Sequence, residues 1–549
     1  MNKQIKLKGK IVDVFKEDIY PGEITIQDGK ILQIRPVSEA VDEVFIIPGL
    51  VDSHIHIESS MLSPQMFAHE AVKHGVVATV SDPHEIANVL GEEGINFMVE
   101  NGEKVPFKFY FGVPSCVPAT PFETSGSILG ANIVEELINK KQHLYLAEMM
   151  NFPGVINEDP EVMKKIEAAK KAGKPIDGHA PGLRGKDAQK YIDAGISTDH
   201  ECMDIEEARE RISMGMKIQI REGSAAKNFH ALYPLIYESP GQVMLCSDDK
   251  HPDDLIDSYL EVLIKTGLEK KINLFHMLRA ATVNPVRHYN LNVGLLQEGD
   301  PADLAIVDDL TNFNVLKTYI DGNVVFGDDK SYIETSDIVP LNIMEATPIE
   351  PVDIEVEDKG LPVRVIEAMD SQLYTMSKEL FPLSSKGVLI SDTQKDILKV
   401  VVYNRYKNYP PSIGFIKNFN LKYGAIATSI AHDSHNIIAV GVEDESIVKA
   451  INQLINQKGG ITIANGNEIF SLKLEIAGLM THQSAEVVAK QYKRLTEIAQ
   501  DLGCKFMSPF MTLSFMALPV IPELKITDRG LFDVQKFEYT GLFAYKNLK

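Results

Sequence analysis

Short apolar runs alternate with amphipathic stretches through the middle of the chain. Eight of these runs are candidate strands, and they span 44–57, 75–83, 107–115, 143–149, 175–180, 196–201, 217–222 and 243–249. Between them lie segments whose apolar residues recur at helical spacing, such as 159–173 and 204–215. Strands that alternate with helices indicate βα units and a parallel sheet. The pattern predicts an α/β protein with a TIM-like (β/α)8 barrel over residues 47–290.

Both flanks of this region show the alternation of half-buried strands. Residues 5–37 and 294–326 alternate apolar and polar positions, with Asp-Gly turns at 28–29 and 321–322. We therefore predict one small β-sandwich domain built from residues 1–46 plus 291–335. After a Pro- and acid-rich stretch at 347–360, amphipathic helices are predicted at 446–460 and 484–503. They belong to a predicted C-terminal α+β domain at 355–549.

Composition narrows the classes of partner. The 549 residues carry a net charge of −22, which argues against a nucleic-acid backbone or an anionic membrane as partner. Four cysteines are too few for a disulfide framework and lack the spacing of a zinc site. The chain shows no signal-peptide pattern and no apolar run of membrane-spanning length. We expect a cytoplasmic protein that acts on a small molecule.

Metal-capable side chains follow several of the predicted barrel strands at their carboxyl ends, where barrel active sites are built. They are His54 and His56 after the first strand, Glu148 after the fourth, His179 after the fifth, His200 after the sixth and Asp248 after the eighth. Alternation along the first strand places both of its histidines, and Glu58 beyond them, on one face. Four imidazoles and two carboxylates at one mouth suit a pair of divalent ions with a carboxylate bridge.

Longer phrases around these residues are more specific. They are PGLVDSHIHIESSMLSP (48–64), SDPHEIANVLG (81–91), DGHAPGL (177–183), HECM (200–203), REGSAAKN (221–228) and CSDDKHPDDL (246–255). Together they resemble the adenine deaminases of the amidohydrolase superfamily. The resemblance implies hydrolysis of adenine to hypoxanthine and ammonia in purine salvage, by attack on ring C6 of a hydroxide bridging two metal ions. It favours Mn²⁺, with Fe²⁺ or Zn²⁺ as alternatives, and suggests a homo-oligomer, with a dimer expected.

The resemblance also implies a role for each candidate ligand. It places His54 and His56 on the first ion, His179 and His200 on the second, Glu148 at the bridge, and Asp248 on metal as the group that shuttles a proton. Many members of the superfamily carry a carboxylated lysine at the bridge, where this chain has glutamate.

Further polar residues near the strand ends are candidates for catalysis or substrate binding. A donor to N1 of the ring would assist the attack; the candidates are Glu58, His84 and Glu85. The candidates for substrate contact are Ser59, Ser60, Asp82, Arg221, Ser224 and Asp249. Other roles stay open for some of them, because Asp82 and Ser224 also suit helix capping and Asp249 suits the fixing of a loop. Glu58 could instead hold a ligand histidine.

Two other functions remain alternatives. The same site would serve an enzyme acting on another aminopurine or on a cyclic amide. A non-catalytic metal-binding relative would be expected to lack at least one ligand, and all six candidates are present. In the C-terminal region, His432, Asp433 and His435 form a further polar cluster. Structural or interface use is favoured there over metal binding, because no further cluster of ligands supports a metal site.

Overall fold

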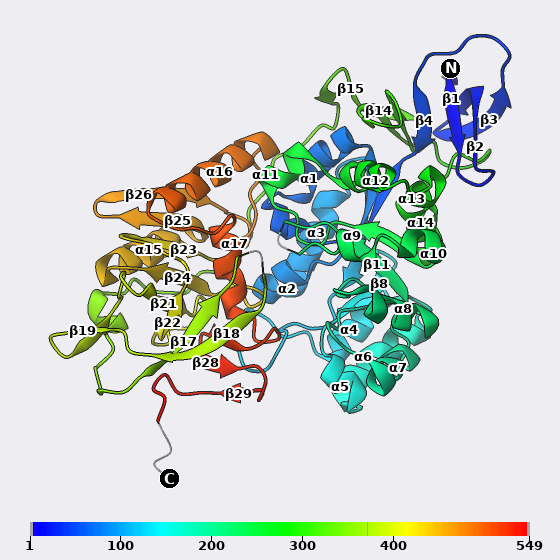
Figure 1. Cartoon of the computed structure of the whole chain (residues 1–549). Helices are drawn as coiled ribbons and strands as arrows, with labels where there is room; N and C mark the ends of the chain where they lie inside the picture. Colours follow the sequence, from blue (N-terminus) through cyan, green and yellow to red (C-terminus); the bar gives the residue numbers. More distant parts are fainter. Residues whose placement is uncertain (1–3, 225, 371, 546–549) are drawn as a thin grey trace. The chain divides into compact units, whose positions relative to one another are not determined.

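The computed structural model describes residues 4–224, 226–370 and 372–545 (Figure 1). Contact between segments divides the chain into two compact units. The first comprises residues 1–83, 96–115 and 130–337, and the second comprises 84–95, 116–129 and 338–549. The chain therefore leaves the first unit twice before residue 338. The predicted three-domain boundaries, at 1–46 plus 291–335, 47–290 and 355–549, stay a prediction.

Eight parallel strands form the centre of the first unit. They are β5 (Leu50–Ile55), β6 (Val76–Ser81), β7 (Lys108–Val113), β8 (His143–Met149), β9 (Ile176–Gly178), β10 (Thr198–Asp199), β11 (Lys217–Arg221) and β12 (Val243–Cys246). Strands β5 to β9 form one ladder and β10 to β12 another. The Ser197 N–H donates to the Ile176 carbonyl at 2.8 Å, and a parallel bridge joins Ile55 to Asp248. These links join the two ladders in chain order, and the predicted α/β barrel is confirmed.

Short helices connect these strands. They are η1 (Ile57–Ser60), α1 (Pro64–Ala71), η2 (Val72–His74), α3 (Glu92–Gly102), α4 (Ala131–Ile138), α5 (Phe152–Ile156), α6 (Pro160–Lys171), α7 (Gly185–Asp193), α8 (Ile205–Ser213), α9 (Phe229–Leu232), α10 (Leu235–Glu238), α11 (Pro252–Asp257), α12 (Leu260–Glu269), α13 (Leu274–Ala280) and α14 (Val283–Tyr289). Helix α6 begins where Asp159 accepts from the Val162 N–H at 3.1 Å, with Pro160 in the first turn. Asp204 caps α8 in the same way, so both predicted helical segments are confirmed.

The two flanks of the barrel pair in one sheet. Its order is β16 (Lys330–Ser331), β15 (Asn323–Gly327), β14 (Val315–Ile320), β13 (Leu304–Val307), β4 (Phe45–Pro48), β1 (Gln4–Asp13), β2 (Asp18–Gln27) and β3 (Lys30–Pro36). Ile24 of β2 shares a buried cluster with Leu304 of β13 and Tyr319 of β14. Since side chains from distant strands share this core, the sheet folds over itself as a sandwich does.

The first predicted barrel strand, 44–57, is wrong as a single element. The chain forms β4 in the flanking sheet, passes Gly49, and then forms β5 in the barrel. A Cβ on Gly49 would lie 2.5 Å from the side chain of Val77 in β6, so the close approach of this segment to β6 requires glycine. The strand also ends at Ile55, before the residues that were predicted to continue it.

The second unit is built on a mixed sheet. Its order is β18 (Thr375–Leu380), β17 (Val363–Ala368), β22 (Ser412–Lys417), β21 (Ile397–Tyr403), β24 (Ile437–Gly441), β23 (Ala425–Thr428), β25 (Gly460–Asn465) and β26 (Glu468–Lys473). Smaller elements are α2 (His84–Leu90), η3 (Pro351–Ile354), β19 (Leu383–Ser385), β20 (Val388–Ile390), α17 (Pro509–Ser514), η4 (Phe515–Ala517), β27 (Leu524–Thr527), β28 (Gly530–Asp533) and β29 (Glu538–Tyr539).

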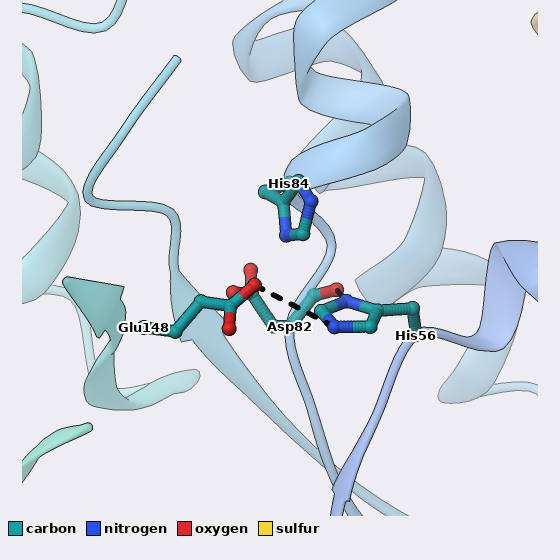
Figure 2. Close-up of side chains that lie close together, drawn as sticks. All are labelled: His56, Asp82, His84 and Glu148. Atoms are coloured by element: carbon teal, nitrogen blue, oxygen red, sulfur yellow. Dashed lines mark hydrogen bonds and ion pairs between the residues drawn. The ribbon is translucent and has the colours of Figure 1, made fainter. Parts of the chain in front are cut away.

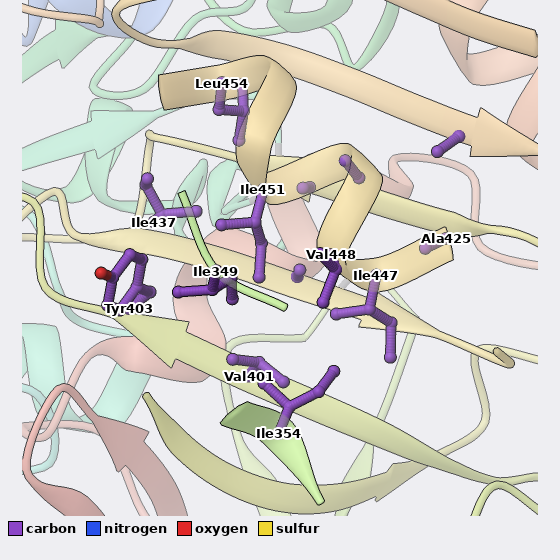
Figure 3. Packing of buried hydrophobic residues seen from close by; sticks show 14 of the residues in the cluster. Ile349, Ile354, Val401, Tyr403, Ala425, Ile437, Ile447, Val448, Ile451 and Leu454 are labelled. Carbon is purple, nitrogen blue, oxygen red and sulfur yellow. The ribbon is translucent and has the colours of Figure 1, made fainter. Parts of the chain in front are cut away.

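Both predicted helices of this unit are confirmed, as α15 (Asp444–Gln457) and α16 (Ala485–Asp501). Helix α15 lays Ile447, Ile451 and Leu454 against Val401 and Ile437 of the sheet (Figure 3). Its hydrophobic residues recur at helical spacing because one face is buried in this core. Among the described residues, no helix combines the length and the apolar character needed to cross a membrane.

Candidate metal centre

Two histidines meet where β5 ends. The Nε2 atoms of His54 and His56 lie 3.2 Å apart, and both side chains are buried. Two nitrogens bound to one tetrahedral zinc ion would be separated by about 3.3 Å, from bond lengths near 2.05 Å. The Nδ1 of His56 lies 3.2 Å from the carbonyl oxygen of Asp82. Because a carbonyl only accepts, Nδ1 carries the proton, and Nε2 presents its lone pair to the site.

Glu148, in β8, faces all four predicted histidine ligands. Its carboxylate oxygens lie 3.9 Å from His54 Nε2, 3.6 Å from His56 Nε2, 3.0 Å from His179 Nδ1 and 3.2 Å from His200 Nε2. Figure 2 shows this carboxylate facing His56, beside Asp82. One carboxylate in reach of two pairs of imidazoles is the arrangement that a bridging ligand requires.

Asp248 completes the side of His54 and His56. Its Oδ1 lies 3.3 Å from His56 Nε2 and 3.8 Å from His54 Nε2. The residue follows β12 in the left-handed region, at φ 58°, which aspartate tolerates better than most side chains. Its N–H donates to the carbonyl of His54 at 2.9 Å. The end of the eighth strand is thereby attached to the first strand at the point where the ligands converge.

Glu201 is a site residue that the sequence analysis missed. Its Oε1 lies 3.4 Å from His200 Nε2 and 3.6 Å from His179 Nδ1. It directly follows His200, so strand alternation would direct it away from the site. Strand β10 ends at Asp199, however, and alternation no longer applies beyond it. The only available signal was its place beside a ligand histidine.

Arg221 joins the carboxylates around the centre. Its guanidinium donates to Glu201 Oε1 and to Asp248 Oδ2, and Nη2 donates to Glu201 Oε2 at 3.1 Å. The side chain is buried. Although burial opposes ionisation, this guanidinium and nearby histidines hold the pKa of Asp248 well below its usual value. The structure therefore directs Arg221 toward two carboxylates of the site.

Buried acids stand behind the ligands. Asp52 Oδ1 accepts from the N–H of His54 at 3.1 Å, and its Oδ2 accepts from the hydroxyl of Tyr259 at 2.6 Å. Tyr289 donates to Asp177 at 2.7 Å. Burial raises the pKa of Asp52 to about 6 and that of Asp177 to about 7. These contacts fix the backbone that carries the ligands.

Among the predicted substrate-contact residues, Arg221 is the last residue of β11 and Asp82 follows β6. The others lie on the segments after β5, β11 and β12. Ser59 donates to Asp249 Oδ1 at 2.6 Å, and Ser60 donates to the carbonyl of Ile57. Ser224 accepts from the N–H of His251 at 2.8 Å. Glu58 is buried in η1. Its placement by strand alternation was wrong, because the strand ends three residues before it.

His84 and Glu85 begin α2, which belongs to the second unit. Glu85 does not stand alone there, because its carboxylate lies 3.0 Å from His432 Nδ1 and 3.2 Å from His435 Nε2. His84 Nε2 lies 3.9 Å from Asp433 Oδ2. The view that no further ligand supports the C-terminal histidine cluster was therefore wrong: the supporting carboxylate comes from a distant part of the sequence.

The donor atoms of the first unit fit divalent ions. Three overlapping groups have ligand atoms within 4.8 Å of one another, and they are His54–His56–Asp248, His54–Glu148–His200 and His179–His200–Glu201. Imidazole nitrogens mixed with carboxylate oxygens suit Zn²⁺, Fe²⁺ or Mn²⁺. Burial, with His200 and His56 close by, lowers the pKa of His54 well below its usual value, which keeps that imidazole in the neutral form that binds metal.

Two known families match this chain. The Amidohydrolase family matches residues 45–325, and the Adenine deaminase C-terminal domain matches residues 372–538. An adenine deaminase of Methanosarcina mazei is 54% identical over 98% of this chain and 99% of that protein. An adenine deaminase of Salinibacter ruber is 48% identical over 99% of this chain and 100% of that protein. Among solved structures, a D-hydantoinase aligns with 61% of this chain and 97% of the hydantoinase chain. The sequence identity is 14% and the TM-score is 0.46. The identity to the curated relatives over nearly the full length shows that the chain belongs to the adenine deaminase family of amidohydrolases.

Proposed function

We propose that the protein hydrolyses adenine to hypoxanthine and ammonia in purine salvage. The observation that carries this proposal is the position of Glu148, whose carboxylate lies within 4 Å of four imidazoles, three of them buried. The near full-length similarity to adenine deaminases supports the choice of substrate.

The proposed ligands divide into two overlapping sets. The residues that would hold one ion are His54, His56 and Asp248, those that would hold the other are His179 and His200, and Glu148 would bridge them. Bound divalent ions lower the pKa of water and so supply hydroxide at neutral pH. We propose Mn²⁺ as the native ion, with Fe²⁺ and Zn²⁺ as alternatives, and a cytoplasmic homodimer as the working form.

Asp248 is the proposed proton carrier. It is ionised in the resting site because Arg221 holds its pKa low, so it can accept the proton of the attacking water. It then returns this proton to the exocyclic amino group, which leaves ring C6 as ammonia. Arg221 is thus proposed to position the two carboxylates, and is no longer proposed to contact the substrate.

Glu58 is the proposed donor to ring N1. It is buried on the loop that follows the ligand-bearing strand. Glu85 suits this role less well, because its carboxylate faces two histidines of the second unit. His84 remains a rival, and substrate contacts are proposed for Ser59, Ser60, Asp82, Ser224 and Asp249. If Glu58→Gln leaves the rate untouched, the donor lies elsewhere.

Ammonia release from adenine tests the proposal. The full chain is stripped with chelator, reconstituted with Mn²⁺, and compared with His54→Ala/His56→Ala and with Glu148→Gln. We expect metal-dependent ammonia from the wild type and a loss of at least about 100-fold in both variants, together with lower metal content. A substitution of the buried His74, which is not a proposed ligand, serves as control and should retain activity. No ammonia from folded, metal-loaded wild type would refute adenine as substrate and leave other aminopurines and cyclic amides to be tested.

A further inference from the structure

We propose that the second unit binds its own divalent transition-metal ion, such as Zn²⁺, through Glu85, His432 and His435. Glu85 lies in the first turn of α2, and the two histidines lie on the loop between β23 and β24. All three residues belong to the second unit. None of them is a proposed ligand of the barrel centre, so this inference does not rest on the proposed function.

The three side chains converge on one point. Glu85 Oε1 lies 3.0 Å from His432 Nδ1, and Glu85 Oε2 lies 3.2 Å from His435 Nε2. One ligand atom from each residue falls within 4.8 Å of the other two. Two histidines and one glutamate form the ligand set of many catalytic zinc sites, and with open positions they also suit Fe²⁺. The distances match those expected between ligands that share an ion.

The state of His435 is the second observation. Its ring is completely buried, and within the described part of the chain neither of its nitrogens has a hydrogen-bond partner. Its Nε2 lies 3.2 Å from Glu85 Oε2, but without the alignment of a hydrogen bond. A buried polar atom without a partner is costly, and native structures rarely leave one in that state. A bound cation would satisfy the lone pair of the imidazole and the charge of the carboxylate together.

The loop that carries the histidines is held in place by the rest of the unit. The ring of His432 stacks on Phe515, with centroids 4.4 Å apart and planes 9° apart. The N–H of His435 donates to the carbonyl of Ala431 at 2.7 Å, and Asn436 donates to Thr124 at 2.9 Å. The ligands are therefore oriented by contacts that do not depend on the ion, as preorganised metal sites require.

A second acid lies beside these three residues. Asp433 is buried, and its Oδ1 lies 3.8 Å from His432 Nδ1. Its Oδ2 has no hydrogen-bond partner among the residues that the structure describes. Asp433 thus adds negative charge beside His432. An extra carboxylate also favours a cation over a neutral ligand at this place.

The first unit contains a useful contrast. His74 is also buried beside two carboxylates, with Nδ1 3.2 Å from Glu261 and Nε2 3.8 Å from Glu70. There the Glu261 contact is a hydrogen bond, and only one imidazole is present. This cluster is a structural ion pair and provides a matched control for the loss of a buried histidine.

Metal content measured in a chain without the barrel ligands tests the proposal. A full-length variant carrying His54→Ala, His56→Ala, His179→Ala and His200→Ala is stripped with chelator, loaded with Zn²⁺ and desalted. We expect about one ion per chain to remain by elemental analysis. Adding His435→Ala or Glu85→Gln should reduce this to near zero, whereas adding His74→Ala should leave it unchanged. With Co²⁺ in place of Zn²⁺, the visible absorption of the bound ion should follow the same pattern.

Two results would overturn the site. One is a folded background variant that retains no ion at Zn²⁺ concentrations that load the wild-type chain. The other is an ion that persists after both Glu85→Gln and His435→Ala, which would place it elsewhere. Circular dichroism tests whether each variant is folded. If His435→Ala does not fold, the metal content of Glu85→Gln, which preserves the shape of the side chain, tests the site. Failure of the adenine assay would not affect any of these outcomes.

Discussion

Replacing Arg221 with methionine should destabilise the first unit far more than it weakens substrate binding. The guanidinium contacts Glu201 through two nitrogens and Asp248 through one, and all three side chains are buried. The variant would leave two carboxylates in a low-dielectric site without their cation. Breaking a buried ion pair in this way costs about 3–5 kcal/mol. The proposed positioning role of Arg221 makes this penalty the main effect of the substitution.

A double-mutant cycle distinguishes the positioning of carboxylates by Arg221 from a direct contact between Arg221 and the substrate. With Glu201→Gln already in place, Arg221→Met leaves one unpaired carboxylate in place of two, so its cost should fall by about 1–3 kcal/mol. Urea unfolding of the metal-free full chain, followed by circular dichroism, measures the four free energies of unfolding. Additivity within about 0.5 kcal/mol would refute the reasoning. A raised KM with unchanged stability would instead assign Arg221 to the substrate.

Three further predictions concern the scaffold. A hydrogen bond with Glu261 and the nearby carboxylate of Glu70 outweigh burial and raise the pKa of His74 to about 9. Protonated His74 should therefore contribute about 3 kcal/mol to the free energy of unfolding below pH 6.5, and this contribution is lost as the pH rises through 9. In urea unfolding, His74→Gln should be less stable than wild type at pH 6, and the difference should be much smaller above pH 9.5. Ile451→Ala opens a cavity in the core of the second unit and should cost about 2–5 kcal/mol of its unfolding free energy, with no change in ammonia release. Gly49→Ala brings a methyl group within 2.5 Å of a β6 valine and should cost about 1–3 kcal/mol, measured by thermal unfolding.

The barrel and most of the proposed metal ligands could be predicted from local pattern. Buried parallel strands read as apolar runs, and side chains at their carboxyl ends share one mouth whatever the loops between them do. His179 and His200 could be assigned to one centre for this reason, although their strands are only 3 and 2 residues long. The rule depends on the order of strands and needs no knowledge of distances.

Residues beyond a strand end could not be placed in the same way. Glu58 and Glu201 both lie past the last strand residue, where alternation no longer dictates direction. The switch at Gly49 was also hidden, because β4 and β5 read as one apolar run. Glu85 meets His432 and His435 across more than 300 residues of sequence, and no local periodicity relates such distant positions.

Because residues 84–95 and 116–129 belong to the second unit, the chain cannot be cut cleanly between its two units. A fragment that ends at residue 337 would retain 84–95 and 116–129 without the segments that complete their unit. The N–H of Thr124 would lose Asp528, its carbonyl would lose Asn436, and Glu85 would lose both histidines. Such a fragment would expose apolar surface and unpaired polar groups, and would be prone to aggregate. The two fragments should therefore fold only when they are co-expressed and complement each other. A gene that encodes either half alone would yield a protein with a folding penalty.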